Sequence, residues 1–326
     1  MLIVPALYLV GGIILLWLGA EVLIRGASLL GTRAGVSPIV VGLTVVSVGT
    51  SLPELAVCVI AVLQGSSDLA VGNIMGSNLA NIGLVLGVAA VIRPLQVRRL
   101  VIRREVPWMI VVTLLAFPVI WDLNVGRLEG TFLALVLTFY LFRLLPAARK
   151  EEAEILEEQL KDLPVVEGPE MDRRLRRLVV PLIMVAVGSV LLVVAARSIV
   201  MGATEVAEAL GVSELLIGLS VLAVGTSLPE LATTSVAAFR RQADLAVGNI
   251  VGSNIFNLTL VLGGTALVRP VQVQPRVLMV EYPTVLILSL LLLPLASQRR
   301  HLGRREGALF LMLYALSWLW IGRASL

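Results

Sequence analysis

Two glutamates, Glu54 and Glu230, stand near the centre of segments that are otherwise apolar and long enough to cross a lipid bilayer. A carboxylate at the bilayer centre costs roughly 2.5 to 3.5 kcal/mol on insertion scales, so two of them cost on the order of 5 to 7 kcal/mol. A bound cation, a proton or a water-filled cavity must offset this cost. The two acids therefore indicate an ion site.

Side chains that carry oxygen atoms accompany each glutamate at helical spacing. Ser47, Thr50 and Ser51 precede Glu54 on the same helical face. In the next span, amides and a hydroxyl recur every four residues and form a second oxygen-bearing stripe. The candidate ligands on these stripes and their later counterparts are Ser47, Thr50, Ser51, Glu54, Asn73, Ser77, Asn81, Thr226, Ser227, Glu230, Asn249, Ser253 and Asn257.

Two prolines add backbone oxygens to this set. Pro53 and Pro229 each lack an N–H group and crowd the carbonyl four residues earlier, which predicts helix breaks near Gly49 and Gly225. Freed carbonyls at membrane depth are tolerated only where they line a cavity or are buried in protein. The breaks are therefore expected beside the ion site.

The donor set favours hard cations. Calcium takes six to eight oxygen ligands, and two carboxylates neutralise one divalent ion. Sodium needs fewer and weaker oxygens. Zinc, copper and nickel prefer imidazole or thiolate, which this pattern does not supply.

Several polar residues have structural interpretations beside the functional one. Serines and threonines in membrane helices often bond their own backbone or a neighbouring helix, and Asn73 and Asn249 are either ligands or helix-packing residues. Other acids are expected to cap helices or to be solvated near span ends; the caps are Asp68 and Asp244, and the solvated acids are Glu21, Glu205 and Glu208. The central glutamates have no comparable structural interpretation.

The segment that carries these residues occurs twice. Residues 42–97 return as residues 218–273, and the two windows are identical at 33 of 56 aligned positions. Each copy contributes five spans, an odd number, so the second copy enters the membrane from the opposite side. This predicts an all-α membrane protein of ten transmembrane helices in two inverted five-helix repeats, with broken helices around a midplane ion site.

The expected spans divide the chain into three parts. Residues 1–146 form the first five-helix repeat, residues 147–177 a hydrophilic linker, and residues 178–326 the second, inverted repeat. The ten spans are 2–24, 37–63, 68–92, 106–121, 128–145, 178–200, 213–239, 244–268, 277–297 and 307–322.

Composition supports the membrane assignment. The 326 residues are 58% hydrophobic and 15% charged, which is typical of a polytopic membrane protein. The net charge of +4 does not indicate a nucleic-acid partner, because most basic residues stand at the ends of apolar segments. No nucleophile stands beside a base in the pattern, so the chain is not expected to be an enzyme.

Basic residues also predict the orientation. With the N-terminus outside, the cytoplasmic loops hold 21 Lys and Arg residues and the outer loops hold 4. Positive residues are enriched on the cytoplasmic side of membrane proteins. Both termini are therefore expected outside and the 147–177 linker in the cytoplasm, in a cell membrane that is the inner membrane of a prokaryote.

The motif GTSLPEL, with GN and GSN downstream and present in both halves, resembles the alpha repeats of the cation/calcium exchanger superfamily. The similarity is greatest to sodium/calcium exchangers, and in particular to prokaryotic members with two alpha repeats, and it covers nearly the whole chain. The resemblance implies transport of calcium and sodium, without a cofactor. It also assigns ligands: calcium at Glu54 and Glu230 with Thr50 and Thr226, and sodium at those groups with Ser51, Ser77, Ser227, Ser253 and backbone near Ser47 and Ala223.

Two departures from related branches refine this expectation. Asn257 replaces the aspartate of many prokaryotic and potassium-dependent members, which disfavours potassium dependence. Leu55 and Leu231 follow the glutamates where the calcium/proton branch usually has histidine.

The leading hypothesis is sodium/calcium antiport; the alternatives are a calcium/proton exchanger on the same fold and a cation channel. Protein partners cannot be inferred.

Overall fold

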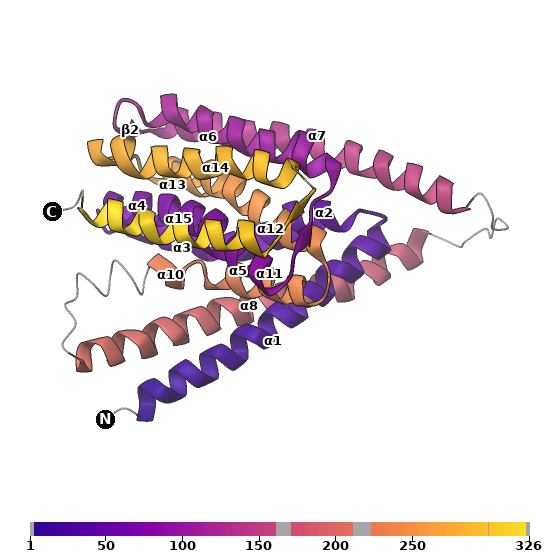
Figure 1. The fold of residues 1–326 in the computed structure, drawn as a ribbon, viewed down its shortest axis with the longest axis horizontal. Helices are drawn as coiled ribbons and strands as arrows, with labels where there is room; N and C mark the ends of the chain where they lie inside the picture. The colour runs from indigo at the N-terminus through magenta and orange to yellow at the C-terminus, as the bar shows by residue number, and fades with distance from the viewer. Residues whose placement is uncertain (1–2, 161–170, 211–222, 299, 324–326) are drawn as a thin grey trace.

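The computed structural model describes residues 3–160, 171–210, 223–298 and 300–323, and these are mostly helical (Figure 1). Within them, six helical segments are long and apolar enough to cross a membrane: Val4–Ala34, Pro38–Leu63, Ser67–Ile92, Leu178–Ala207, Ala243–Val268 and Val277–Ser297. The other predicted spans correspond to α6 (Val106–Ile120), α7 (Arg127–Leu160), α11 (Leu228–Phe239) and α15 (Arg304–Arg323). The first part of the 213–239 span lies outside the described residues.

The first repeat starts with one long helix and continues as helices interrupted by short π-helical turns. Its elements are α1 (Ile3–Ala34), α2 (Pro38–Val41), η1 (Gly42–Val46), α3 (Ser47–Leu63), α4 (Ser67–Ala80), η2 (Asn81–Val85), α5 (Leu86–Ile92), β1 (Leu95–Gln96), η3 (Val101–Glu105), α6 (Val106–Ile120), β2 (Asn124–Val125) and α7 (Arg127–Leu160).

The elements of the second repeat follow the same order as those of the first from the third span of each repeat onward. They are α8 (Met171–Ala209), α10 (Ala223–Gly225), α11 (Leu228–Phe239), α12 (Ala243–Phe256), η5 (Asn257–Val261), α13 (Leu262–Val268), β3 (Val271–Gln272), η6 (Val277–Glu281), α14 (Tyr282–Ser297), β4 (His301–Leu302) and α15 (Arg304–Arg323). The π-turns η2 and η5 begin at the equivalent residues Asn81 and Asn257.

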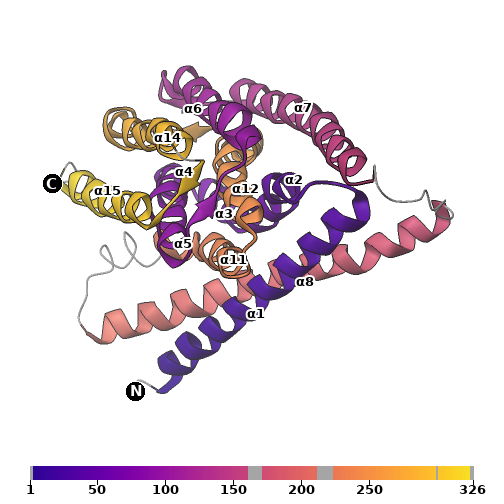
Figure 2. The same ribbon diagram turned by 45° about the vertical axis from the view of Figure 1, so that its right-hand side comes forward.

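Helices α1 and α8 pack against each other along one side of the bundle (Figures 1 and 2). Glycines allow the two backbones to approach closely. A Cβ atom on Gly26 would lie 2.9 Å from the backbone nitrogen of Val185, and one on Gly188 would lie 2.6 Å from that of Leu23. Side chains do not fit at such distances, so small residues are required along this contact.

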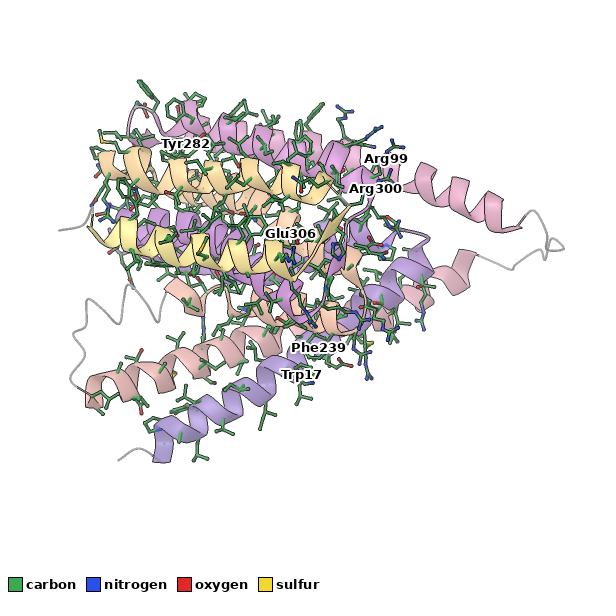
Figure 3. All side chains as sticks on the ribbon, viewed as in Figure 1. Trp17, Arg99, Phe239, Tyr282, Arg300 and Glu306 are labelled. Carbon is green, nitrogen blue, oxygen red and sulfur yellow. The ribbon has the colours of Figure 1, made fainter. Side chains whose placement is uncertain are left out.

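Short strands join the two repeats at their loops. Strand β1 pairs with β4, and β2 pairs with β3, both antiparallel. Each pair links the segment after the third span of one repeat to the segment before the last span of the other. Arg99 and Arg300 lie at the same end of the bundle, next to β1 and β4 (Figure 3).

The acids that open the motif spans also join the repeats. Arg98 Nε lies 2.8 Å from Asp244 Oδ2, and Gln274 Nε2 donates to Asp68 Oδ2 at 2.6 Å. The sequence-based interpretation of Asp68 and Asp244 as helix caps is wrong. Each lies inside the first helical turn, where its carboxylate reaches a loop of the other repeat.

One of the two predicted helix breaks is present. In the second repeat, α10 ends at Gly225, and Thr226 and Ser227 form a turn before α11 starts. Pro229 occupies the first turn of α11, where its missing N–H group leaves no helical hydrogen bond unmade. The predicted break near Gly225 is therefore confirmed; Leu222 lies outside the described residues.

The predicted break near Gly49 is wrong. Helix α3 runs through Pro53 without interruption, and the irregular turn is η1, before Ser47. Neighbouring helices can compensate for a proline in a membrane helix. At the turn before α3, Ser47 Oγ lies 2.7 Å from the Gly42 carbonyl and 3.0 Å from the Asn249 carbonyl on α12, so the start of α3 is hydrogen-bonded to a neighbouring helix.

The linker is partly helical. Helix α7 continues to Leu160 and α8 begins at Met171, so both extend into the segment 147–177. Residues 161–170 lie outside the described part of the chain.

Candidate ion-binding site

Glu54 on α3 and Glu230 on α11 are buried in the core, with 1% and 0% of their surface exposed. Their carboxyl groups are close enough to repel one another when both are ionised. None of the four carboxylate oxygens makes a regular hydrogen bond to a described residue. A buried acid pair without a compensating cation is strongly unfavourable, so this arrangement is suited to binding a positive ion.

The structure places most of the other predicted ligands in the same core. Those with at most 1% exposure are Ser47, Thr50, Ser51, Ser77, Asn81, Ser227, Asn249, Ser253 and Asn257. Thr226 is half-buried in the turn before α11, and Ala223 begins α10, with its side chain outside the described residues. Both repeats thus contribute oxygen atoms to one buried region.

Two hydroxyl pairs connect the repeats beside the glutamates. Thr50 Oγ1 lies 3.4 Å from Ser253 Oγ, and Ser227 Oγ lies 3.4 Å from Ser77 Oγ. In each pair, a residue in the turn of chain before a glutamate contacts the serine of the GSN motif in the other repeat. Hydrogen bonds of this length are weak, so a bound cation can replace these contacts between the hydroxyl groups.

Several buried polar atoms have no hydrogen-bond partner in the described part of the chain. They include Ser51 Oγ and both side-chain polar atoms of Asn81 and Asn257. Buried polar groups are nearly always hydrogen-bonded, and exceptions call for an explanation such as a bound ion. Asn81 and Asn257 also begin π-turns, which are frequent at functional sites.

The motif asparagines Asn73 and Asn249 both hydrogen-bond a neighbouring helix. Asn73 Nδ2 donates to Cys58 Sγ at 3.3 Å, and Asn249 Nδ2 donates to Thr234 Oγ1 at 3.1 Å at the equivalent place. These contacts favour the helix-packing interpretation of both asparagines. The sequence analysis missed Thr234 and its neighbour Thr233, although a signal was present: both are polar where the first copy has Val57 and Cys58.

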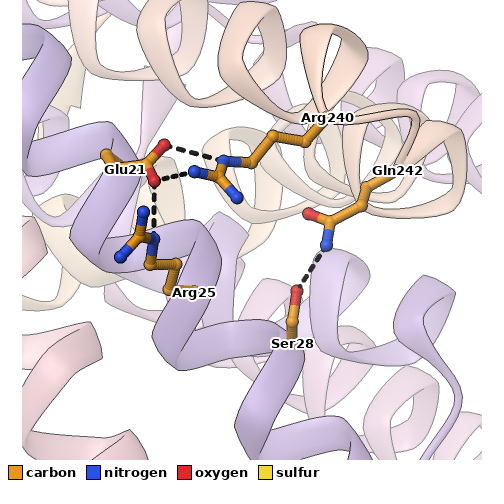
Figure 4. Close-up of polar contacts among 5 residues, drawn as sticks. All are labelled: Glu21, Arg25, Ser28, Arg240 and Gln242. Carbon is orange, nitrogen blue, oxygen red and sulfur yellow. Dashed lines mark hydrogen bonds and ion pairs between the residues drawn. The ribbon is translucent and has the colours of Figure 1, made fainter.

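Glu21 is not simply solvated, contrary to the sequence-based expectation (Figure 4). Arg25 Nε donates to its carboxylate at 2.6 Å and Arg240 Nε at 2.7 Å. Nearby, Gln242 Nε2 donates to Ser28 Oγ at 2.9 Å. The acid fastens α1 to the end of α11 because arginines approach it from both helices.

The same contact between α1 and α11 has an aromatic part. The rings of Trp17 and Phe239 meet edge to face with their centroids 6.2 Å apart (Figure 3). Of the two other acids expected to be solvated, Glu205 is exposed, and the side chain of Glu208 lies outside the described residues.

The chain is similar to known proteins over almost its whole length. The sequence profile of the sodium/calcium exchanger protein family matches residues 4–145 and 180–322. Inner membrane protein YrbG of Escherichia coli is 38% identical over 314 residues, covering 95% of this chain and 94% of the relative. Sodium/calcium exchanger MaX1 of Methanosarcina acetivorans is 31% identical, covering 96% and 97%. A solved structure of the sodium-calcium exchanger NCX_Mj superposes with a TM-score of 0.80 at 29% identity, covering 97% and 98%.

Proposed function

Because the chain belongs to the sodium/calcium exchanger family, we propose that it is a secondary active antiporter that exchanges sodium for calcium, with Glu54 and Glu230 shared by the competing ions. Membership of this family makes the chain a multi-pass membrane transporter and not an enzyme. Sodium and calcium ions are its substrates, and it needs no cofactor.

The observation that carries the proposal is the buried pair of carboxylates, one from each repeat, without a regular hydrogen bond to any described residue. Two carboxylates neutralise one calcium ion. Sodium ions that occupy the same groups exclude calcium, and calcium excludes them. This competition couples the two fluxes, because the protein changes the side of the membrane to which the site is open while the site holds one kind of ion or the other.

The ligands proposed for the two ions follow the family motif. Calcium is held by the two glutamates with Thr50 and Thr226. Sodium uses these groups together with the remaining oxygens, which are those of Ser51, Ser77, Asn81, Ser227, Ser253 and Asn257 and the backbone near Ser47 and Ala223. The burial and mutual contacts of the hydroxyl-bearing residues support this set.

Alternating access follows from the inverted repeats. In such transporters, one repeat or bundle moves against the other around a fixed midplane site. The two repeats here differ in shape, since α3 is continuous whereas α10 and α11 are separated by a turn. That difference supports a cycle in which the repeats exchange conformations and expose the site to opposite sides.

We assign residues 1–146 and 178–326 to the two repeats and 147–177 to the linker between them. Both termini are placed outside the cell and the linker in the cytoplasm. The basis is the excess of Lys and Arg in the loops on the linker side. A bacterial relative named as an inner membrane protein supports the same membrane for this chain.

Ion-driven flux in sealed proteoliposomes tests the function. We expect calcium uptake when sodium is high inside and low outside, and no uptake when potassium or choline replaces sodium at equal concentration. Uptake that is indifferent to the sodium gradient would remove sodium coupling. Uptake driven by a pH gradient alone would instead support a calcium/proton exchanger, and flux that does not saturate and needs no counter-ion would indicate a channel.

A further inference from the structure

Asn249 connects the helices that carry the two glutamates. It lies in α12 with 1% of its surface exposed. Its Nδ2 atom lies 3.2 Å from Thr233 Oγ1 and 3.1 Å from Thr234 Oγ1, both on α11. Its Oδ1 atom lies 3.2 Å from Thr50 Oγ1 on α3. Every polar atom of this amide is therefore engaged between the two glutamate helices.

The neighbours fix which way the amide faces. Thr233 Oγ1 lies 2.7 Å from the Pro229 carbonyl and donates its single proton there. It can then only accept a hydrogen bond from Asn249, so the amide nitrogen faces α11 and the amide oxygen faces Thr50. Thr50 accordingly donates its hydroxyl proton to Asn249 Oδ1.

This direction matters for a cation at the glutamates. The Thr50 hydroxyl group lies within hydrogen-bonding reach of the Glu230 carboxylate. A cation held by both groups would repel the hydroxyl proton of Thr50, because like charges repel. The proton then needs an acceptor other than the carboxylate. Asn249 Oδ1 is closer to Thr50 Oγ1 than the alternatives, which are the Ser47 carbonyl at 3.3 Å and Ser253 Oγ at 3.4 Å.

We infer that Asn249 is a positioning residue. Held by Thr233 and Thr234, it accepts the hydrogen bond of the Thr50 hydroxyl group, and this leaves the lone pairs of the Thr50 oxygen available to bind the cation. The inference rests on the proposed cation site at Glu54 and Glu230. It gives Asn249 an indirect role, since the residue acts on the ion only through Thr50.

The first repeat offers a matched control. Val57 and Cys58 stand where the second repeat has Thr233 and Thr234. Among the described residues, the side-chain amide of Asn73 donates to the Cys58 sulfur and to no other group. A thiol sulfur is a weak acceptor. The second repeat alone therefore has hydroxyl groups at both of these positions, and removing the thiol is expected to have little effect.

Equilibrium calcium binding to the purified, full-length protein tests the inference. Thr233→Val and Thr234→Val should each weaken calcium binding by about fivefold, the equivalent of one buried hydrogen bond. Thr233→Ser and Thr234→Ser keep the hydroxyl and should bind within about twofold of the wild type. In a Thr50→Ala background, neither valine substitution should weaken binding further, because the group on which they act is absent. Cys58→Ala should stay within about twofold of the wild type.

Two outcomes would overturn the positioning role: folded valine variants that bind calcium normally, or valine variants that weaken binding equally with and without Thr50. If Thr233→Val does not fold, Thr234→Val alone decides the matter. Thr233 also contacts the α11 backbone, whereas the hydrogen bond of Thr234 to the described residues is the one from Asn249. The binding readout is independent of sodium. Normal binding effects without sodium-driven uptake would reject the antiport proposal and retain the role of Asn249, whereas a wild type that binds no calcium would reject both.

Discussion

Glu54 and Glu230 pose at the residue scale the energetic problem that the whole fold must solve. Both side chains are buried, they repel each other when ionised, and no described Lys or Arg side chain pairs with either. Replacing either glutamate by a neutral residue should therefore leave the folded protein equally or more stable, and it should abolish transport. This opposition separates an ion site from a structural acid pair.

Glu54→Gln and Glu230→Gln should each abolish sodium-driven calcium uptake, with a loss on the order of a hundredfold or more, because removing one partner of a buried ionic contact costs about 3 to 5 kcal/mol. Each variant should insert and fold, and without ions its thermal midpoint should equal or exceed that of the wild type.

Calcium should raise the thermal midpoint of the wild type and leave both variants unchanged. At a hundred times the dissociation constant, the expected stabilisation is about 2.7 kcal/mol. A glutamine variant that exchanges calcium at the wild-type rate would show that the site has been assigned to the wrong residues.

At the scale of elements, the contact between α1 and α8 depends on backbone proximity and not on side-chain volume. A Cβ atom on Gly26 would meet the backbone of Val185 at 2.9 Å and the Pro181 carbonyl at 3.0 Å, and neither backbone atom can turn away. A Cβ atom on Gly11, in the same helix, meets no described atom within 4 Å. The two glycines therefore predict opposite results for the same substitution.

Gly26→Ala should destabilise the protein by about 1 to 3 kcal/mol, because the added methyl group overpacks the contact between α1 and α8. Gly11→Ala should be neutral or should stabilise α1 by up to about 1 kcal/mol, since alanine favours helix. Thermal unfolding in one detergent compares the two. Equal midpoints for both variants would contradict the close contact.

The ion pair of Glu21 with Arg240 should fasten α1 to α11 with a modest energy. Their side chains are 15% and 39% exposed, so screening by solvent reduces the pair to about 0.2 to 1 kcal/mol. A double-mutant cycle of Glu21→Gln and Arg240→Gln, followed by denaturant unfolding, should show this coupling at low salt and lose it in high salt. Additive effects at low salt would mean that the pair contributes no coupling.

For the whole molecule, the inverted repeats are interlocked by the pairs β1 with β4 and β2 with β3, and by the side chains of Asp68 and Asp244 that cross between repeats. Each contact occurs twice, once at each equivalent place. The two copies therefore stabilise each other instead of folding as separate units, which is the expected basis for coordinated motion around one central site.

The orientation in the membrane is testable with introduced cysteines in a Cys58→Ala background. Ala324→Cys should react with a membrane-impermeant maleimide in intact cells, and Glu151→Cys should react only after permeabilisation, because the basic loops keep the linker in the cytoplasm. Labelling at position 151 in intact cells would invert the proposed topology.

Much of this architecture could be predicted without coordinates. The cost of placing Glu54 or Glu230 in an apolar span depends only on the local sequence. The helical spacing of the oxygen-bearing side chains around them is also visible in the local sequence. The break near Gly49 was mispredicted because the effect of Pro53 depends on what packs against the helix. The two-residue strands were missed because so short a segment has no recognisable pattern.

By itself, the sequence determined the membrane spans, the duplication and inversion of the repeats, and the two central acids, since hydropathy, internal identity and the cost of a charge in lipid are all readable along one chain. Only the tertiary structure decided the partners: Asn249 with Thr50 and Thr234, Glu21 with Arg240, and Asp244 with Arg98. In most of these pairs, the two residues are more than a hundred positions apart in the sequence. Which side chains meet is decided by the angles and offsets at which the packed helices cross.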